Sequence, residues 1–193
     1  QEVIRTRLGF CSAIAKSVAG VLEVGMPTRG LRSPRNTFVK EVIPIDKGVI
    51  TTQLGALVCV YRKLVLSKGG MPKPSVARLA TNDTAGEVTI SLGIGYDELV
   101  GVNYHAKAGM PGLVLVLVNP GLGESVMRQV TEVANLDQVI TYPAGWSGME
   151  AHAFMFGKWI PESGTTITTT TTPWRYPSDQ SDTVYCGEIH ELL

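Results

Sequence analysis

The sequence has 193 residues, of which 44% are hydrophobic and 18% charged, and its 17 Lys and Arg balance its 17 Asp and Glu. This size and composition are those of one or at most two globular domains with a substantial core. Zero net charge argues against a protein that binds nucleic acid or an anionic membrane surface, because both tasks require a basic excess. The longest apolar run, 112–118, is far shorter than the roughly 20 residues of a membrane helix, so we expect no membrane span.

The first two dozen residues have the pattern of an amphipathic helix with a broad apolar face. Gly25 and Pro27 mark its end. The helix docks on the protein's own core or, in the alternative interpretation, on a neighbouring subunit. The side chains expected at this interface are Ile4, Leu8, Cys11, Ile14 and Val18. Ser33 followed by Pro34 is typical of a helix start, which predicts a short second helix over 34–40.

From residue 46 onward, short apolar runs with a period of two alternate with turn residues, which is typical of an antiparallel sandwich. We expect a helical segment over 1–45 and an immunoglobulin-like or fibronectin-like β-sandwich over 46–193. No helical pattern is evident between the strands, which argues against a parallel sheet with crossover helices. The predicted strands are 49–53, 57–66, 75–80, 87–93, 113–118, 125–132, 138–142, 150–158 and 182–189. The unbroken apolar run 113–118 predicts a central strand buried on both faces.

A threonine-rich segment, 159–180, interrupts the strand pattern before the last strand. It combines a run of threonines, which favour extended backbone, with prolines and three aromatic residues. We interpret it either as a hairpin folded on its own sandwich or as an arm that grips another subunit. The residues assigned to the arm are Trp159, Thr165, Thr168, Thr172, Trp174 and Tyr176.

Catalytic and metal-binding motifs are not evident. The three histidines are scattered, so neither a metal nor a cofactor is expected. The string Gly93-Ile94-Gly95 lacks dinucleotide-binding spacing and is expected to have no helix after it. Ser147 lacks the second glycine of a nucleophile elbow. The sequence therefore predicts a protein that is not an enzyme.

Two further features concern covalent chemistry. The three cysteines are expected to be buried thiols, and a bridge between Cys59 and Cys186 is the alternative. Thr84 lies in an N-x-T pattern in a predicted turn, and it is also part of an Asp-Thr-Ala string like the O-glycosylation signature of Bacteroidota proteins. The string that contains Thr183 is similar, but chance occurrence is the simpler interpretation of both.

Several strings along nearly the whole chain resemble, in order, an uncharacterised protein family of Bacteroidota and their phages. The most specific of them are SPRNTFVK at 33–40, LVLSKGGMP at 64–72 and SDTVYCG at 181–187. The family has a short hairpin where this chain has the threonine-rich segment, so that segment is a departure. No activity is assigned to the family, and its motifs are helix caps, strand ends and turns.

These observations predict a non-enzymatic structural protein that assembles with copies of itself, as part of a surface filament or a virion. It would lie outside the cell, on the cell surface or in the virion. The alternative is a surface adhesion or carbohydrate-binding module, in which Trp146, Trp159, Trp174 and Tyr176 would stack on sugar rings.

Overall fold

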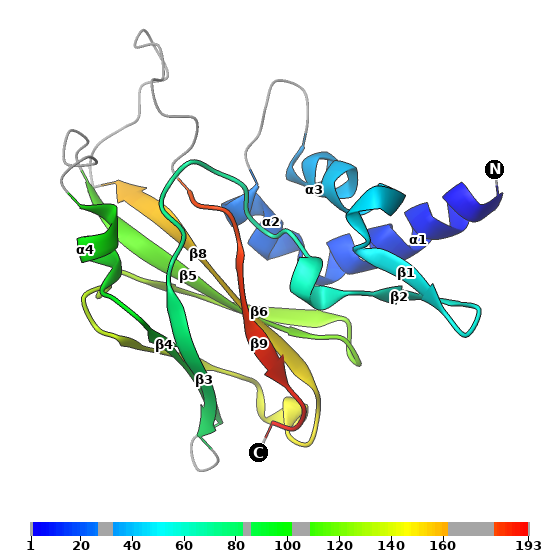
Figure 1. Ribbon diagram of the computed structural model, residues 1–193. Helices are drawn as coiled ribbons and strands as arrows, with labels where there is room; N and C mark the ends of the chain where they lie inside the picture. The colour runs from blue at the N-terminus through cyan, green and yellow to red at the C-terminus, as the bar shows by residue number, and fades with distance from the viewer. Residues whose placement is uncertain (1, 27–32, 83–85, 102–108, 162–179, 193) are drawn as a thin grey trace, which may run out of the picture.

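The structure is a computed structural model that describes residues 2–26, 33–82, 86–101, 109–161 and 180–192, apart from the side chains of residues 2–4 and 161. Within these residues the protein is mainly β, with antiparallel sheets and a few helices (Figure 1), as the sequence predicts. The strands are β1 (Ile50–Gln53), β2 (Ala56–Cys59), β3 (Val76–Asn82), β4 (Glu87–Leu92), β5 (Gly109–Asn119), β6 (Glu124–Val130), β7 (Asp137–Thr141), β8 (Ala151–Pro161) and β9 (Val184–Ile189). The helices are α1 (Glu2–Ser17), α2 (Ala19–Gly25), α3 (Pro34–Val42) and α4 (Tyr96–Val100), with 3₁₀ turns η1 (Ile45–Lys47), η2 (Tyr61–Lys63) and η4 (Ala144–Trp146).

Two sheets share an apolar core. One has the strand order β3-β4-β7 and the other the order β6-β5-β8-β9, while β1 and β2 form a separate hairpin. Val88 and Ile90 of β4 belong to the same buried cluster as Leu115 of β5 and Met155 of β8. This core therefore joins the three-stranded sheet to one face of the four-stranded sheet.

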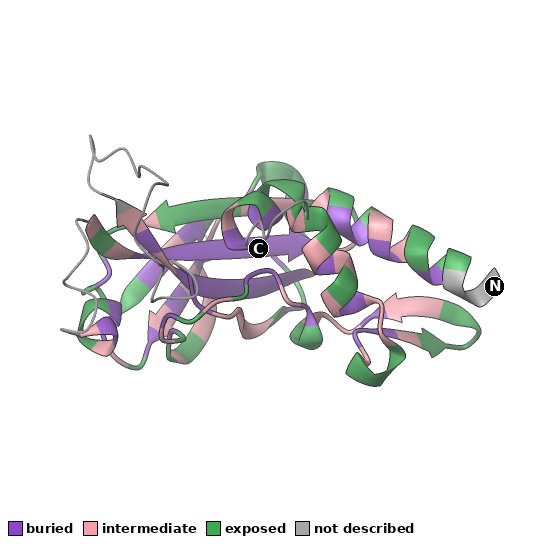
Figure 2. Ribbon diagram, turned by 90° about the horizontal axis from the view of Figure 1, so that it is seen from above, coloured by how far each residue is buried: buried purple, intermediate pink, exposed green. Residues whose placement is uncertain are grey.

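The N-terminal helices cover the opposite face of the four-stranded sheet. Ile14 of α1 and Phe38 of α3 share a second buried cluster with Val116 of β5 and Phe156 of β8. Figure 2 shows the central strands as buried elements between the surrounding layers. The four-stranded sheet is thus enclosed on both faces, by helices on one side and by the other sheet on the other.

This layering explains the apolar run of β5. Leu113, Leu115 and Leu117 belong to the cluster between the sheets, whereas Val114 and Val116 belong to the cluster under the helices. All five side chains are fully buried. Because successive side chains of a strand point to opposite faces, both faces must be apolar when both are covered, and the prediction of a doubly buried strand is confirmed.

The N-terminal helical pattern forms two helices rather than one. An 80° bend separates α1 from α2. Cys11, Ile14 and Val18 are buried as predicted, but Leu8 is 45% exposed and its predicted burial on the chain's own core is wrong. Leu8 is in the N-terminal half of α1, which extends beyond the four-stranded sheet in Figure 1, so this sheet does not cover it.

Two other predictions are corrected by the structure. The predicted strand 57–66 ends at Cys59, because Lys63 N–H bonds to the Val60 carbonyl and Leu64 N–H to the Tyr61 carbonyl, which forms the turn η2. A short helix, α4, follows Gly95 where none was expected. Its Tyr96 side chain is completely buried, so tertiary packing stabilises a helix that is too short to show a periodic pattern.

Within the described residues, no single helix is long and apolar enough to cross a membrane, and α1 with α2 reaches that length only as a bent pair. The division into 1–45 and 46–193 stays a prediction. Helical residues before position 45 and strand residues after it share one core cluster.

Candidate functional site

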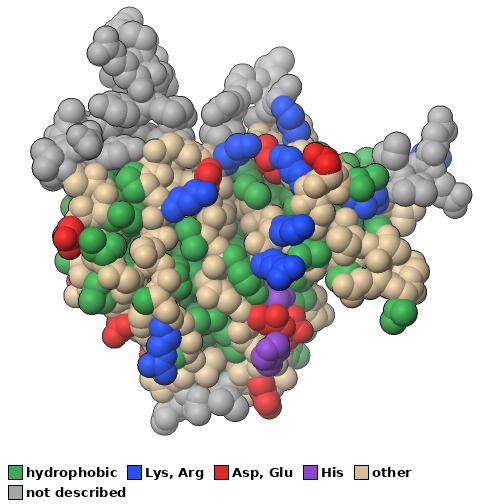
Figure 3. Space-filling view, viewed as in Figure 1, with side chains coloured by type: hydrophobic (Ala, Val, Ile, Leu, Met, Phe, Trp, Pro, Cys, Tyr) green, Lys and Arg blue, Asp and Glu red, His purple; other side chains and the backbone are tan. Residues whose placement is uncertain are grey.

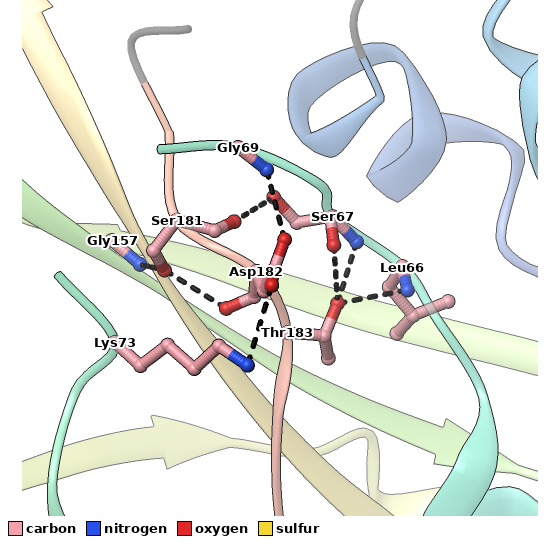
Figure 4. Close-up of polar contacts among 8 residues, drawn as sticks. All are labelled: Leu66, Ser67, Gly69, Lys73, Gly157, Ser181, Asp182 and Thr183. Atoms are coloured by element: carbon pink, nitrogen blue, oxygen red, sulfur yellow. Dashed lines mark hydrogen bonds and ion pairs between the residues drawn. The ribbon is translucent and has the colours of Figure 1, made fainter. Parts of the chain in front are cut away.

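Two segments far apart in the sequence meet beside the end of α2. They are 64–72 and 181–183, and both belong to strings on which the family resemblance depends. Figure 4 shows their side chains and main chains pointing toward one another. We call this contact region the junction.

Thr183 is the centre of the junction. Its Oγ1 accepts hydrogen bonds from Leu66 N–H at 2.9 Å and Ser67 N–H at 2.6 Å, and donates to the Ser67 carbonyl at 3.1 Å. The Thr183 N–H donates to the same carbonyl. One threonine thus satisfies polar groups of a segment that is too irregular to satisfy them by strand pairing.

The two serines of the junction bind main-chain groups in a similar way. Ser67 Oγ donates to the Ser181 carbonyl at 2.6 Å, while Ser181 Oγ accepts from Gly157 N–H of β8 at 2.8 Å and donates to the Asp182 carbonyl. Both serines are completely buried. Their hydroxyls are therefore committed to the fold, and neither is placed to attack a substrate.

Asp182 closes the exposed side of the junction. Its carboxylate accepts from Gly69 N–H at 3.1 Å and pairs with Lys73 Nζ at 3.3 Å. Both side chains are substantially exposed, so this ion pair contributes little stability.

Close packing around the junction requires glycine at two positions. A Cβ at Gly157 would overlap the Tyr96 hydroxyl, and a Cβ at Gly25 would overlap the Leu66 carbonyl oxygen. The Gly25 carbonyl instead accepts bonds from Lys68 N–H and from Gln180 Nε2. The junction therefore ties the helical layer, the 64–72 segment and β8 together.

A second polar cluster surrounds His152 at the other end of β8. His152 stacks on Tyr61 with ring centroids 4.1 Å apart. Its Nδ1 lies 3.1 Å from the Tyr185 hydroxyl and its Nε2 lies 3.0 Å from Glu150 Oε1. Burial lowers the pKa of His152, although Glu150 and Glu188 act in the opposite direction. A neutral imidazole here connects η2 to β8 and β9.

We predict that His152 makes stability pH-dependent. Its pKa is lower in the folded state than the ordinary 6.5, so the unfolded chain binds a proton that the folded chain does not. The resulting stability is present above pH 6.5 and is lost as the pH falls toward the lowered pKa. His152→Gln should therefore show a smaller loss of stability between about pH 7 and pH 5, measured by urea unfolding.

Thr141 provides the control for this experiment. It is exposed on β7, so Thr141→Gln introduces the same side chain without removing a titrating group and should retain the wild-type slope. An unchanged slope in His152→Gln would show that burial of this imidazole does not control the pH response.

Of the residues assigned to the arm, the structure describes only Trp159. This side chain is buried, whereas Thr165, Thr168, Thr172, Trp174 and Tyr176 lie outside the described residues. Thr84 and the side chain of Ile4 also lie outside them. At the second glycosylation-like string the Thr183 hydroxyl is engaged in the junction, so Thr183 is not an acceptor in this fold.

The cysteines are free thiols, and the bridge between Cys59 and Cys186 is not formed. Burial raises the pKa of Cys11 to about 11 and the pKa of both Cys59 and Cys186 to about 12. The reactive thiolate is therefore scarce at neutral pH.

Sugar stacking by Trp146 and Trp159 is ruled out in this structure, because both are buried. The aromatic surface of the alternative function would then depend on Trp174 and Tyr176. In the described part of the chain, no three His, Cys, Asp or Glu side chains are grouped so that they could hold a metal ion.

Neither the junction nor the His152 cluster was found by sequence reasoning. The junction had a signal, since Ser67 and Thr183 are hydroxyl residues beside apolar runs, but nothing in the sequence pairs the two segments. Comparison with models of protein families and with curated proteins finds no match for this chain.

Proposed function

We propose that the chain is a non-enzymatic structural protein that assembles with copies of itself, as a component of a surface filament or a virion. The observation that carries this proposal is the exposure of Leu8. Cys11, Ile14 and Val18 continue the same helical face into the core, while Leu8 extends it to solvent on a projecting part of α1. An apolar surface that continues a buried face is a natural contact for a neighbouring subunit.

The threonine-rich arm is the second part of this proposal. β8 runs to Pro161, and Lys158 near its end pairs with Gln180 as an antiparallel bridge, so the two ends of the threonine-rich segment are attached close together. The return point is fixed, since Gln180 bonds to the Gly25 carbonyl and Ser181 N–H to the Gly157 carbonyl. These anchors support the proposal of an arm that contacts a neighbouring subunit.

We also propose that the two facing sheets form a fibronectin-like sandwich and that the chain belongs to the Bacteroidota and phage family it resembles. One sheet contains β3, β4 and β7, and the facing sheet contains β5, β6, β8 and β9. This division of the strands between two facing sheets supports the sandwich. The convergence of the 64–72 and 181–187 strings on the junction supports the resemblance, because a shared fold would retain such a contact.

Sedimentation velocity tests the proposed assembly. The wild type should sediment as a species larger than the monomer, and both Leu8→Lys and deletion of 165–172 should reduce that species while leaving the monomer folded. At an exposed position, a substitution costs less than about 1 kcal/mol. The exposed Ala13 on α1 provides a matched control as Ala13→Lys.

A wild type that remains monomeric at high concentration contradicts the proposed function. If assembly persists in Leu8→Lys, α1 is not part of the contact between copies. If assembly persists after the deletion, the arm is not part of that contact.

A further inference from the structure

The β1–β2 hairpin stands away from the two larger sheets. Figures 1 and 2 show it projecting from the same end of the molecule as the N-terminal half of α1. Thr52, Gln53 and Ala56 are exposed, and the turn residue Leu54 is fully exposed. The hairpin is thus accessible to another molecule at its turn and the adjoining ends of both strands.

The hairpin turn contains an unexpected residue. Leu54 and Gly55 have φ values of +47° and +83°, a combination that favours Asn or Gly at the first position. Leucine is disfavoured here by its backbone conformation and by the exposure of its side chain to water. A contact that covers the turn would remove the cost of exposing the Leu54 side chain to water.

The hairpin carries no charge, and its surface at the right of Figure 3 shows neither basic nor acidic side chains. The chain has no charged residue between Lys47 and Arg62, although natural proteins usually place charges on exposed edge strands to prevent pairing with other chains. Because the hairpin lacks such charges, we infer that pairing with a strand of another chain is not prevented there.

The outer edge of β2 is open, unlike that of β1. In an antiparallel ladder, successive residues direct their N–H and C=O groups alternately toward and away from the partner strand. Val60 faces β1, because its N–H bonds to the Val49 carbonyl. By this alternation, the N–H and C=O groups of Leu57 face away from β1. No hydrogen bond joins them to another described residue. On the β1 side, the buried Arg7 donates to the Ile50 carbonyl at 3.1 Å, which occupies part of that edge.

We propose that the β2 strands of two copies of this chain pair antiparallel about a two-fold axis at Leu57, which joins two hairpins into one four-stranded sheet. The axis brings Ala56 of one copy opposite Val58 of the other. A segment paired with itself places like residues close together, which is unfavourable when they are charged. The neutral hairpin meets this requirement, and a second copy is therefore the occupant that its composition favours.

The exposed apolar residues at this end of the molecule extend the contact. Leu54 of one copy would lie beside Val60 of the other in this register. A four-residue pairing is small compared with the roughly 800 Å² that each partner buries in a standard interface. The inference therefore rests on the proposed self-assembly, in which Leu8 supplies a separate apolar contact between copies.

A charge-exchange experiment tests the pairing. One variant carries Ala56→Glu with Val58→Glu, and the other carries Ala56→Lys with Val58→Lys. Each alone should dimerise about tenfold more weakly than wild type, because two like-charged pairs then meet across the axis. An equimolar mixture should recover wild-type affinity in sedimentation equilibrium. Thr52→Lys, on the outer edge of β1, is the matched control and should dimerise normally.

Each contrary result has a distinct meaning. If the wild type assembles and the charged variants assemble equally well, the inference is wrong but the proposed function stands. Loss of assembly without recovery in the mixture means that β2 contacts a different surface or a different protein, which also overturns it. A monomeric wild type overturns the proposed function together with the inference.

Amide hydrogen exchange gives a test that needs no substitution. In the wild type, exchange of the Leu57 amide should slow as protein concentration rises, while the outward-facing Thr52 amide of β1 should exchange at an unchanged rate. Equal exchange of the Leu57 amide at low and high concentration, in samples that do assemble, contradicts pairing through β2.

Discussion

Val116→Asp is expected to abolish folding of the chain. Val116 is completely buried in β5 and packs in the cluster between the helices and the four-stranded sheet. Its strand neighbours are Met127 on β6 and Phe154 on β8, so an aspartate there would have no cationic partner beside it in the sheet. A buried unpaired carboxylate costs several kcal/mol, a large fraction of the roughly 5–15 kcal/mol that stabilises a domain.

The measurement is circular dichroism and thermal unfolding of the purified variant, together with its yield in the soluble fraction. Thr141→Asp provides the control, because Thr141 is exposed on β7 and the same carboxylate remains hydrated there. Cooperative unfolding of Val116→Asp near the wild-type temperature would contradict the enclosure of β5 on both faces.

The sequence predicted the elements whose pattern is local. The run 113–118 could be assigned as a doubly buried strand because both of its alternating faces are apolar. Ser33 was assigned as a helix cap, and its Oγ accepts from Asn36 N–H at 3.2 Å at the start of α3. In both places the residues that determine the structure are adjacent in the chain.

Predictions failed where distant residues determine the local structure. The apolar run 64–66 was assigned to a strand, yet Leu66 and Ser67 bond to Thr183, which is 116 positions from Ser67. Leu8 was assigned to the core because helical spacing does not indicate where the sheet beneath a helix ends. The His152 cluster escaped notice for the same reason, since Tyr61, His152 and Tyr185 come from three separate elements.

Thr183→Val is expected to destabilise the chain by about 2–4 kcal/mol, because valine has nearly the same shape as threonine but no hydroxyl. The N–H groups of Leu66 and Ser67 would lose their acceptor, and the Ser67 carbonyl would lose one of its donors. Leu66 and Ser67 are completely buried, so water would replace these bonds poorly. Urea unfolding measures the loss as a lower midpoint with an unchanged slope.

Two substitutions separate the hydroxyl from other effects at this position. Thr183→Ser keeps the oxygen and should remain within about 1 kcal/mol of the wild type, because only a methyl group of a half-buried side chain is lost. Thr141→Val makes the original change on the exposed β7 strand and should have little effect. If Thr183→Val unfolds at the wild-type midpoint, the Thr183 hydroxyl is not what joins the 64–72 segment to the start of β9. The junction would then depend on the buried serines, whose hydroxyls bond to the carbonyls of Ser181 and Asp182.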